Sequence, residues 1–392
     1  MYTPQHISEI INAKLVGESN FSAQHLLIDS RQLTEPSHSI FIALKSERND
    51  GHQYISGLIQ KGVKIFIVSH IPESCIELQN KVCFLVVQDT LKALQKLATY
   101  HREQFQLPII GITGSNGKTI VKEWLYQLLK SDYNIARSPK SYNSQVGVPL
   151  SVWQINNKHT LGIFEAGISE VGEMDLLREI IKPTIGVFTS LGSAHDEGFK
   201  NSSEKLKEKL QLFQNTETVI VNALSLKKEH IELLNQQTFL ISKSEHATLQ
   251  ILEIENLFTH SIIIAKYNGE QISINIPFTD SASVDNAITC WATLLYLKVP
   301  QQEIEKRMSL LQPVAMRLEL KLGNNNCVLI NDFYNSDINA LEIALHHQKQ
   351  QNRGGKKVVI LSDIEQSGKL SWELYEHVSK LDRKSTRLNS SH

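Results

Sequence analysis

The sequence is poor in cysteine, and its four cysteines are widely separated. They form neither C-x-x-C pairs nor zinc-finger spacing, which is typical of a protein in a reducing cytosol and indicates small buried apolar residues. The sequence also lacks a run of about 18 apolar residues and the basic start and apolar core of a signal peptide. We therefore expect a soluble cytoplasmic protein that does not insert into a membrane.

The chain also lacks an excess of charge of either sign. Its 40 Lys and Arg residues face 41 Asp and Glu residues, without a long run of one sign. This balance does not indicate a dedicated nucleic-acid surface. A length of 392 residues fits two or three domains of about 100 to 200 residues each.

The most informative stretch that is present is glycine-rich: residues 111–119 read Gly-Ile-Thr-Gly-Ser-Asn-Gly-Lys-Thr. An apolar run precedes it and apolar residues at helical spacing follow it, so the expected order is strand, loop, helix. Such a loop turns its backbone N–H groups toward phosphates, while its Lys and Thr reach terminal phosphate oxygens and Mg²⁺. Ile112 stands where the strict pattern has glycine, so the loop is a variant. The predicted ATP contacts are Gly114, Ser115, Asn116, Gly117, Lys118 and Thr119.

The pattern of strand and helix signals divides the chain into three parts. Residues 1–105 predict a small α/β unit, and residues 106–312 predict a parallel sheet covered on both faces, with a hairpin around residues 267–270. Residues 313–380 begin a third α/β unit that we expect to be cut short, with strands over 327–331 and 357–361. Residues 381–392 show no apolar period and are interpreted as a non-native tail.

Carboxylates at strand ends are the candidate metal ligands, because Mg²⁺ prefers hard oxygen ligands. Glu165 directly follows the apolar run 161–164, at the tip of an expected strand where open α/β sheets bind ligands. The alternative is that Glu165 caps the helix that opens at 169–174. His195 follows the expected strand 184–189 at the same edge and is a candidate metal ligand or substrate contact. Asp196 and Glu197 remain alternatives to it.

Lys209 lies on an expected helix that begins near Asn201, with Glu204 as the capping partner. At about 100° per residue, Lys209 falls inside the apolar arc of this helix, whereas Lys205 lies at its margin or outside. A lysine that points inward needs a partner or a modification. Snorkelling of the ammonium group to the surface is the alternative.

Weaker signals come from three further residues. Asn286 opens an expected helix, where its amide could bind a base edge or simply belong to a helix start. Arg317 could meet a phosphate and Asp332 a ribose hydroxyl.

Taken together, these motifs resemble the Mur ligases of bacterial cell-wall synthesis, over residues 25 to 370. The resemblance implies a UDP-substrate-binding α/β domain, a central parallel-sheet ATP-binding domain and a truncated Rossmann-like C-terminal domain. Several segments are similar to the branch that adds D-alanyl-D-alanine to UDP-N-acetylmuramoyl-tripeptide. The segments that carry the resemblance are 29–31, 47–52, 112–119, 164–167, 172–174, 194–199 and 332–335.

The resemblance implies ATP and Mg²⁺ as cofactors. Thr119 and Glu165 would hold one Mg²⁺, His195 would help to hold another, and Lys209 matches the family lysine that is carbamylated. The residues matched to adenine, phosphate and ribose contacts are Asn286, Arg317 and Asp332. Those matched to substrate contacts are Ser30, Arg31, Asp50, His52, Asn143, Tyr334 and Asn335. The chain departs from the family pattern at Ser141, Ser144 and Ala282.

The reaction that the resemblance implies is an ADP-forming ligation of an acid to a D-amino acid. The tripeptide carboxylate attacks the γ-phosphate, and the amine of D-alanyl-D-alanine then attacks the acyl phosphate, with Lys118, His195 and Lys209 as catalytic residues. Two alternatives are a folylpolyglutamate-synthase-like ligase and a nucleotide-binding fragment without catalysis. The full protein could also carry a fused alanine racemase. We expect a monomer.

Overall fold

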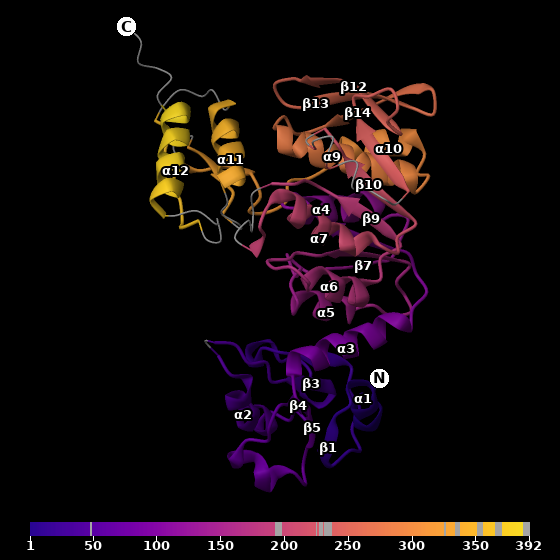
Figure 1. Ribbon diagram of the computed structural model, residues 1–392, viewed down its shortest axis with the longest axis vertical. Helices are drawn as coiled ribbons and strands as arrows, with labels where there is room; N and C mark the ends of the chain where they lie inside the picture. The colour runs from indigo at the N-terminus through magenta and orange to yellow at the C-terminus, as the bar shows by residue number, and fades with distance from the viewer. Residues whose placement is uncertain are drawn as a thin grey trace. The chain divides into compact units, whose positions relative to one another are not determined.

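The computed structural model describes residues 1–47, 49–192, 198–224, 226, 230, 237–324, 327–333, 338–350, 356–364 and 371–386. The chain forms two compact units. Unit 1 comprises Met1–Gln106, Tyr142–Asn157 and Glu179–Ile181, and unit 2 comprises the remaining segments. Figure 1 shows the start of the chain, in indigo and purple, in unit 1.

Unit 1 is built on a sheet whose five described strands lie in the order β1-β5-β4-β3-β2. Strands β2 to β5 are parallel, and β1 runs antiparallel to β5. β3 and β4 are buried along their whole length, and apart from Ser39 they are apolar, as expected for a sheet covered on both faces. The strands are β1 (Lys14–Gly17), β2 (His25–Leu27), β3 (Ser39–Ile42), β4 (Ile65–Val68) and β5 (Cys83–Val86).

Helices cover the two faces of this sheet through separate apolar clusters. One cluster contains α1 (Pro4–Ile11), α3 (Thr90–Glu103) and side chains of α5 (Gly147–Val152). The other contains α2 (Ile55–Gln60) and the 3₁₀ helix η4 (Glu73–Leu78). Three further 3₁₀ helices lie in the loops after β2 and β3: η1 (Ser30–Gln32), η2 (Pro36–His38) and η3 (Gly51–Tyr54).

Unit 2 is built on a larger sheet whose nine described strands lie in the order β14-β13-β12-β11-β10-β9-β6-β8-β7. The strands from β7 to β12 are parallel to their neighbours, which confirms the predicted parallel sheet. β12, β13 and β14 form an antiparallel extension. The strands are β6 (Ile109–Thr113), β7 (Ile135–Arg137), β8 (Leu161–Glu165), β9 (Ile185–Phe188), β10 (Thr218–Asn222), β11 (Thr238–Ser242), β12 (Leu249–Asn256), β13 (Ser261–Tyr267) and β14 (Glu270–Ile276).

Helices also cover both faces of this sheet. α4 (Lys118–Leu129), α9 (Ser281–Tyr296) and α10 (Gln301–Met308) share one apolar core with the strands. On the opposite face, a Cβ atom at Gly186 would lie 2.5 Å from the Phe213 ring of the 3₁₀ helix η6 (Gln211–Phe213). η6 can therefore pack against β9 only because Gly186 has no side chain. α6 (Glu173–Ile181) and α7 (Ser202–Leu210) precede η6 in the chain.

The chain leaves this sheet at Gln312, which is fixed by α4. Trp124 Nε1 donates to the Gln312 carbonyl oxygen at 3.0 Å, and Gln127 Oε1 accepts from the Gln312 N–H at 2.9 Å. The residues that follow form the C-terminal segment, 313–386. It contains the antiparallel pair β15 (Glu319–Leu322) and β16 (Val328–Asn331) and the helices α11 (Ile338–Gln350) and α12 (Ser371–Thr386).

The C-terminal segment differs from the prediction at residues 357–361 and at Cys327. Residues 357–361, predicted as a strand, have no strand hydrogen bonding in the described chain, because no described strand pairs with them. α12 runs from Ser371 to Thr386. Cys75, Cys83 and Cys290 are buried as predicted, whereas Cys327 in this segment is exposed.

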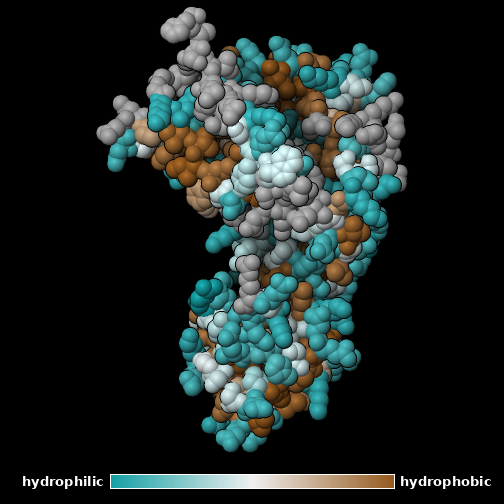
Figure 2. Space-filling model, turned by 60° about the vertical axis from the view of Figure 1, so that its left-hand side comes forward, coloured by the Kyte–Doolittle hydropathy of each residue, from teal (hydrophilic) through white to brown (hydrophobic). Residues whose placement is uncertain are grey.

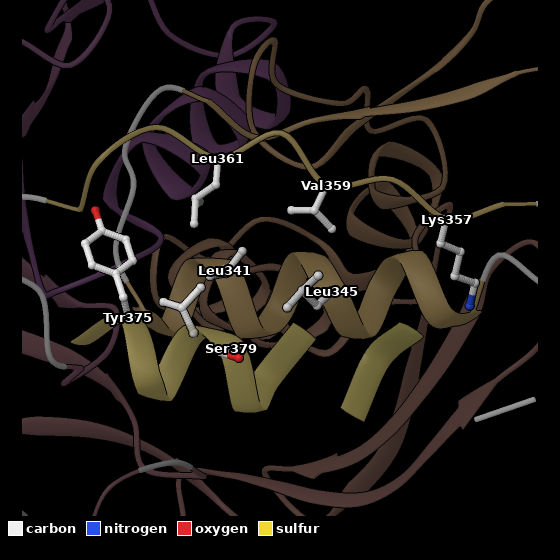
Figure 3. A pocket seen from close by; sticks show the side chains of 8 residues that line it. Leu341, Leu345, Lys357, Val359, Leu361, Tyr375 and Ser379 are labelled. Carbon is white, nitrogen blue, oxygen red and sulfur yellow. The ribbon is translucent and has the colours of Figure 1, made fainter. Parts of the chain in front are cut away.

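A hollow of about 480 Å³ lies in the C-terminal segment, between α11, α12 and residues 357–361. Figure 3 shows Leu341 and Leu345 on α11 and Tyr375 on α12 facing Val359 and Leu361. Exposed apolar side chains also occur in this segment. Figure 2 shows brown, apolar surface both in the upper part of the view and in its lower part. Among the described residues, no helix is long and apolar enough to cross a membrane.

Candidate nucleotide site

The glycine-rich loop joins β6 to α4, in the order that the sequence predicts. Gly114 and Gly117 have φ angles of +148° and +85°, which favour glycine. A Cβ atom at Gly114 would lie 2.1 Å from Thr189 Oγ1, and one at Gly117 would lie 2.3 Å from Asn286 Oδ1. Both positions therefore require glycine for conformation and for space.

Residues directly after β9 form hydrogen bonds with this loop. The Ser115 N–H donates to the Ser190 carbonyl oxygen at 2.8 Å, and the Asn116 N–H donates to Ser190 Oγ at 3.1 Å. Thr189 Oγ1 donates to the Asn116 carbonyl oxygen at 2.6 Å. The predictions did not include Thr189 and Ser190, although their place directly after a strand that neighbours β6 was a usable signal.

Lysine side chains converge on the same loop. Lys118 Nζ donates to the carbonyl oxygens of Gly114 and Ser115 at 2.8 and 2.9 Å. Lys209 Nζ donates to the Gly114 carbonyl oxygen at 3.2 Å, and only 1% of the Lys209 surface is exposed. This burial confirms that Lys209 points inward and excludes snorkelling.

Lys205 corrects the prediction for this helix. It was expected at the margin of the apolar arc or outside it, yet it is 1% exposed. The reason is that its ammonium group donates to the Gly192 carbonyl oxygen at 2.6 Å, so a backbone acceptor offsets its burial. The predicted start of the helix is confirmed, because Asn201 Oδ1 accepts from the Glu204 N–H at 2.9 Å.

Glu165 ends β8 beside the first turn of α4 and is fully buried. Its Oε2 atom accepts from Thr119 Oγ1 at 3.0 Å, and Thr119 Oγ1 lies 2.9 Å from Ser141 Oγ. The alternative role for Glu165, capping α6, is wrong. The N–H groups at the start of α6 donate instead to Glu173 and Glu208.

The topology explains why these groups meet. β6 continues to β7, which lies beyond β8, whereas β8 continues to β9, which lies on the other side of β6. Such a reversal of direction opens a crevice at the carboxyl ends of the strands, where α/β proteins bind ligands. The phosphate loop, Glu165 and the Thr189–Ser190 segment all follow the strands at this place.

The residues at this place fit a divalent cation. Glu165 Oε1 is buried, accepts no hydrogen bond from a described group, and forms an ion pair with the Lys122 ammonium group at 2.9 Å. The described residues contain no cluster of three or more His, Cys, Asp or Glu side chains that could hold a metal. A Mg²⁺ ion here would therefore use Glu165 and Thr119 and complete its shell with water and phosphate oxygens, as Mg²⁺ commonly does.

Asn286 lies beside the phosphate loop, on α9, and is 8% exposed. Its neighbour Asp285 is half-buried, and this burial together with the nearby charge of Asp280 raises the pKa of Asp285 to about 6. A hydrogen bond from Asn222 opposes this rise.

Arg317 and Asp332 lie together in the C-terminal segment. Asp332 Oδ1 accepts from the N–H of Leu318, the residue after Arg317, at 3.2 Å. Met316 and Leu318 on either side of Arg317 have φ angles of +61° and +48°.

In unit 1 the predicted substrate residues follow the adjacent parallel strands β2 and β3. Ser30 lies in η1, and the exposed Arg31 pairs with Asp29, whose pKa its hydrogen bonds lower to about 2. Asn143 is half-buried and precedes α5 in the same unit. The other two predicted residues, Asp50 and His52, form a pair.

The Asp50–His52 pair has a defined tautomer. The Ser69 N–H donates to His52 Nε2 at 3.0 Å, so the proton lies on Nδ1, which is 2.6 Å from Asp50 Oδ1. The His52 N–H and this contact lower the pKa of Asp50. The His70 ring stacks on His52 at 4.3 Å. Ser69 and His70 follow β4 at the same edge and were not predicted.

Three predicted site residues lie outside the described residues: His195, Tyr334 and Asn335. The alternatives Asp196 and Glu197 also lie outside them.

A glycine-rich loop between a buried strand and a helix, with a carboxylate on the neighbouring strand, defines a phosphate-loop nucleotide-binding α/β protein. Residues 112–294 match the Mur ligase middle domain, and residues 23–102 match the catalytic domain of the Mur ligase family. The chain belongs to the Mur ligase family, which confirms the resemblance seen in the sequence.

A curated relative and two solved structures make the likeness specific. The chain is 30% identical over 352 residues to UDP-N-acetylmuramoyl-tripeptide–D-alanyl-D-alanine ligase of Rickettsia prowazekii, covering 86% of this chain and 76% of that protein. A crystal structure of MurF from Acinetobacter baumannii has a TM-score of 0.85 at 25% identity and covers 100% of this chain and 84% of that one. The MurF ligase of Thermotoga maritima in complex with ADP has a TM-score of 0.78 at 20% identity, covering 92% and 82%.

Proposed function

We propose that this protein is the ATP-dependent ligase that adds D-alanyl-D-alanine to UDP-N-acetylmuramoyl-tripeptide in peptidoglycan precursor synthesis. The observation that carries the proposal is the meeting of the Lys118–Thr119 loop with the buried Glu165 and the inward Lys209. The relatives named for this reaction match most of the chain.

The reaction proceeds in two displacements. An oxygen of the tripeptide carboxylate attacks the γ-phosphorus of ATP, the bond to the β,γ-bridging oxygen breaks, and ADP leaves. The amine of D-alanyl-D-alanine then attacks the acyl carbon, inorganic phosphate leaves, and the amine gives up a proton. The first displacement therefore converts a carboxylate oxygen, which is a poor leaving group, into a phosphate, which is a good one.

Residues around the loop support this chemistry by position and charge. The N–H groups at the start of α4 would face the phosphates, whereas those of Ser115 and Asn116 donate to Ser190. Lys118 is placed to leave its carbonyl contacts for phosphate oxygens. Mg²⁺, when bound by Thr119 and Glu165, would neutralise charge on the phosphates. Carbamylation of Lys209, proposed from the family, would turn its buried cation into an anionic ligand.

The proposal includes an assignment of domains. Residues 1–105 bind the UDP-linked substrate, residues 106–312 bind ATP, and residues 313–380 form part of a C-terminal ligase domain with Arg317 and Asp332 as nucleotide contacts. His195, Tyr334 and Asn335 stay predictions for metal and substrate contacts. We place the reaction in the cytoplasm.

Phosphate release tests the proposal. Purified protein with ATP and UDP-N-acetylmuramoyl-tripeptide should release phosphate at a rate that rises strongly on addition of D-alanyl-D-alanine, with the pentapeptide product seen by mass spectrometry. ATP binding without turnover would contradict it and support a fragment that binds nucleotide. Turnover with folyl substrates and glutamate would support the folylpolyglutamate-synthase alternative.

A further inference from the structure

Lys122 is a fully buried lysine one turn after Thr119 on α4. Its ammonium group donates to the Ser138 carbonyl oxygen at 2.7 Å and also to the Lys140 carbonyl oxygen. The same nitrogen lies 2.9 Å from Glu165 Oε1. A buried ammonium group is costly unless it is paired, so this arrangement needs all of these oxygens.

The charges around Lys122 alternate. Lys122 Nζ lies 3.1 Å from Glu123 Oε1, and Arg137 Nη1 donates to the two Glu123 oxygens at 2.5 and 2.6 Å. The Arg137 guanidinium also lies over the Tyr126 ring, 4.0 Å from its centroid. Glu123 is therefore fixed by Arg137, and Lys122 is held between two carboxylates.

The contact of Lys122 with Glu165 fixes the carboxylate by charge. The two atoms form an ion pair at 2.9 Å, while the same ammonium group donates to the two carbonyl oxygens. The other carboxylate oxygen, Oε2, is held at Thr119 Oγ1. Lys122 thus restricts rotation of the carboxylate that faces Thr119.

Lys122 also fixes the chain that follows β7. Its two carbonyl partners, Ser138 and Lys140, belong to a short loop in which Lys140 has a φ of +51°. The next residue, Ser141, places its Oγ 2.9 Å from Thr119 Oγ1, and Ser138 Oγ accepts from the Glu165 N–H at 3.3 Å. One ammonium group therefore holds both neighbours of the Thr119 hydroxyl.

We propose that Lys122 is a positioning residue for the nucleotide–metal site: it orients Glu165 and Ser141 around the Thr119 hydroxyl without contacting the nucleotide. This role rests on the proposed binding of ATP and Mg²⁺ at this loop. It differs from a structural role because it acts through Glu165, so it should appear in the response of nucleotide binding to Mg²⁺.

The test compares ADP affinity with Mg²⁺ and with EDTA, by titration calorimetry. Lys122→Met removes the charge and the donors, whereas Lys122→Gln keeps an amide that can donate to the carbonyl oxygens. In both variants we expect the Mg²⁺-dependent gain in ADP affinity to fall by about tenfold or more, as for other residues that orient a metal ligand. ADP affinity in EDTA should stay at the wild-type value. Lys130→Met, an exposed lysine at the other end of α4, is the matched control.

A double-mutant cycle with Glu165→Gln separates the outcomes. If Lys122 acts through Glu165, adding Lys122→Gln to Glu165→Gln should cause no further loss. Additive losses, or an equal loss of ADP affinity in EDTA, would overturn the positioning role. If Lys122→Met does not fold, Lys122→Gln carries the test. If Mg²⁺ does not change the ADP affinity of the wild-type protein, both the proposed metal site and this role are overturned. If Mg²⁺ raises the ADP affinity of the wild type and of the Lys122 variants equally, the role alone is overturned.

Discussion

At the scale of single residues, Gly117 connects the backbone of the phosphate loop to α9. Its φ of +85° costs an alanine about 1–2 kcal/mol, and the alanine Cβ would also collide with Asn286 Oδ1. We expect Gly117→Ala to weaken ADP binding by about tenfold or more, since 1.4 kcal/mol corresponds to about a factor of ten.

A matched control exists for this substitution. Gly269 has a similar φ of +89°, but no atom lies within 4 Å of the position of its Cβ. Gly269→Ala should lower the free energy of unfolding by a similar backbone cost and leave ADP binding unchanged. Titration calorimetry and thermal unfolding measure the two effects. Normal ADP binding by Gly117→Ala would show that the loop does not hold phosphates as proposed.

Asp285 predicts a pH dependence of stability. Its pKa of about 6 in the folded protein lies above its ordinary value of 3.8, because burial disfavours the ionised form. The folded state therefore binds this proton more tightly than the unfolded state does. The resulting stabilisation of the fold is complete below about pH 3.8 and is lost as the pH rises through about 6. Asp285→Asn avoids this loss. The melting temperature of the variant should rise relative to wild type between about pH 4 and pH 8, and a constant difference would contradict the burial of a charged carboxylate.

Among the residues of the site, prediction succeeded where position and chemistry agreed. Lys118, Thr119 and Glu165 were found because a loop motif and a strand end place them, and they do meet. Lys122 was not singled out, although it lies three and seven residues before Leu125 and Leu129 on the buried face of α4. The periodicity argument that identified Lys209 applies equally to Lys122. The partners of Lys122 come from other strands, so their identity could not be read from local sequence.

At the scale of elements, α6 depends on α7 for its first turn. Glu208 of α7 accepts from the N–H groups of Gly172 and Met174 at 2.8 and 3.1 Å and is 8% exposed. Glu208→Ala leaves these N–H groups without their acceptor, and we expect it to lower the free energy of unfolding by about 1–3 kcal/mol.

Chemical denaturation measures this loss. Lys207→Ala, at the exposed neighbouring position on the same helix, changes helix propensity and charge but removes no such acceptor. It should stay close to the wild-type stability. A loss in Glu208→Ala no larger than that in Lys207→Ala would mean that the cap contributes little.

The elements that sequence predicts best are the buried strands. The strands predicted over 39–44, 65–69, 161–164 and 217–222 lie within one or two residues of β3, β4, β8 and β10, which are buried along their whole length. The 267–270 hairpin was predicted because Asn268 and Gly269 accept the positive φ angles of a primed turn.

The elements that were missed have physical reasons. β7 has three residues, too few for a pattern. In β12 a register shift between Ile251 and Glu253 interrupts the alternation of apolar and polar residues. The helix predicted over 282–299 corresponds to α9, and Lys298, with a φ of +61°, separates it from α10, which was not predicted.

At the scale of the whole molecule, exposed apolar side chains are concentrated in the C-terminal segment. Leu322 is 71% exposed and Ile360 is 97% exposed, and Phe333 and Trp372 are also exposed. Contiguous apolar surface of this kind promotes association. We expect the apparent mass by light scattering to rise with protein concentration, and the rise to be smaller in the Leu322→Asn, Ile360→Asn double variant.

A control for this effect is Phe258, which is fully exposed but lies in the turn between β12 and β13. Phe258→Asn should leave the concentration dependence unchanged. The same reduction in both variants would mean that total exposed apolar area, and not the C-terminal segment, governs association.

α4 is twelve residues long, and its two ends serve different parts of unit 2. Its first turn carries Lys118 and Thr119. In its second half, Trp124 and Gln127 form hydrogen bonds with the backbone of Gln312. A helix of this length moves as a stiff rod, so a small tilt at the phosphates also displaces Gln312. We therefore expect occupancy of the nucleotide site to influence the position of the residues after Pro313 through α4.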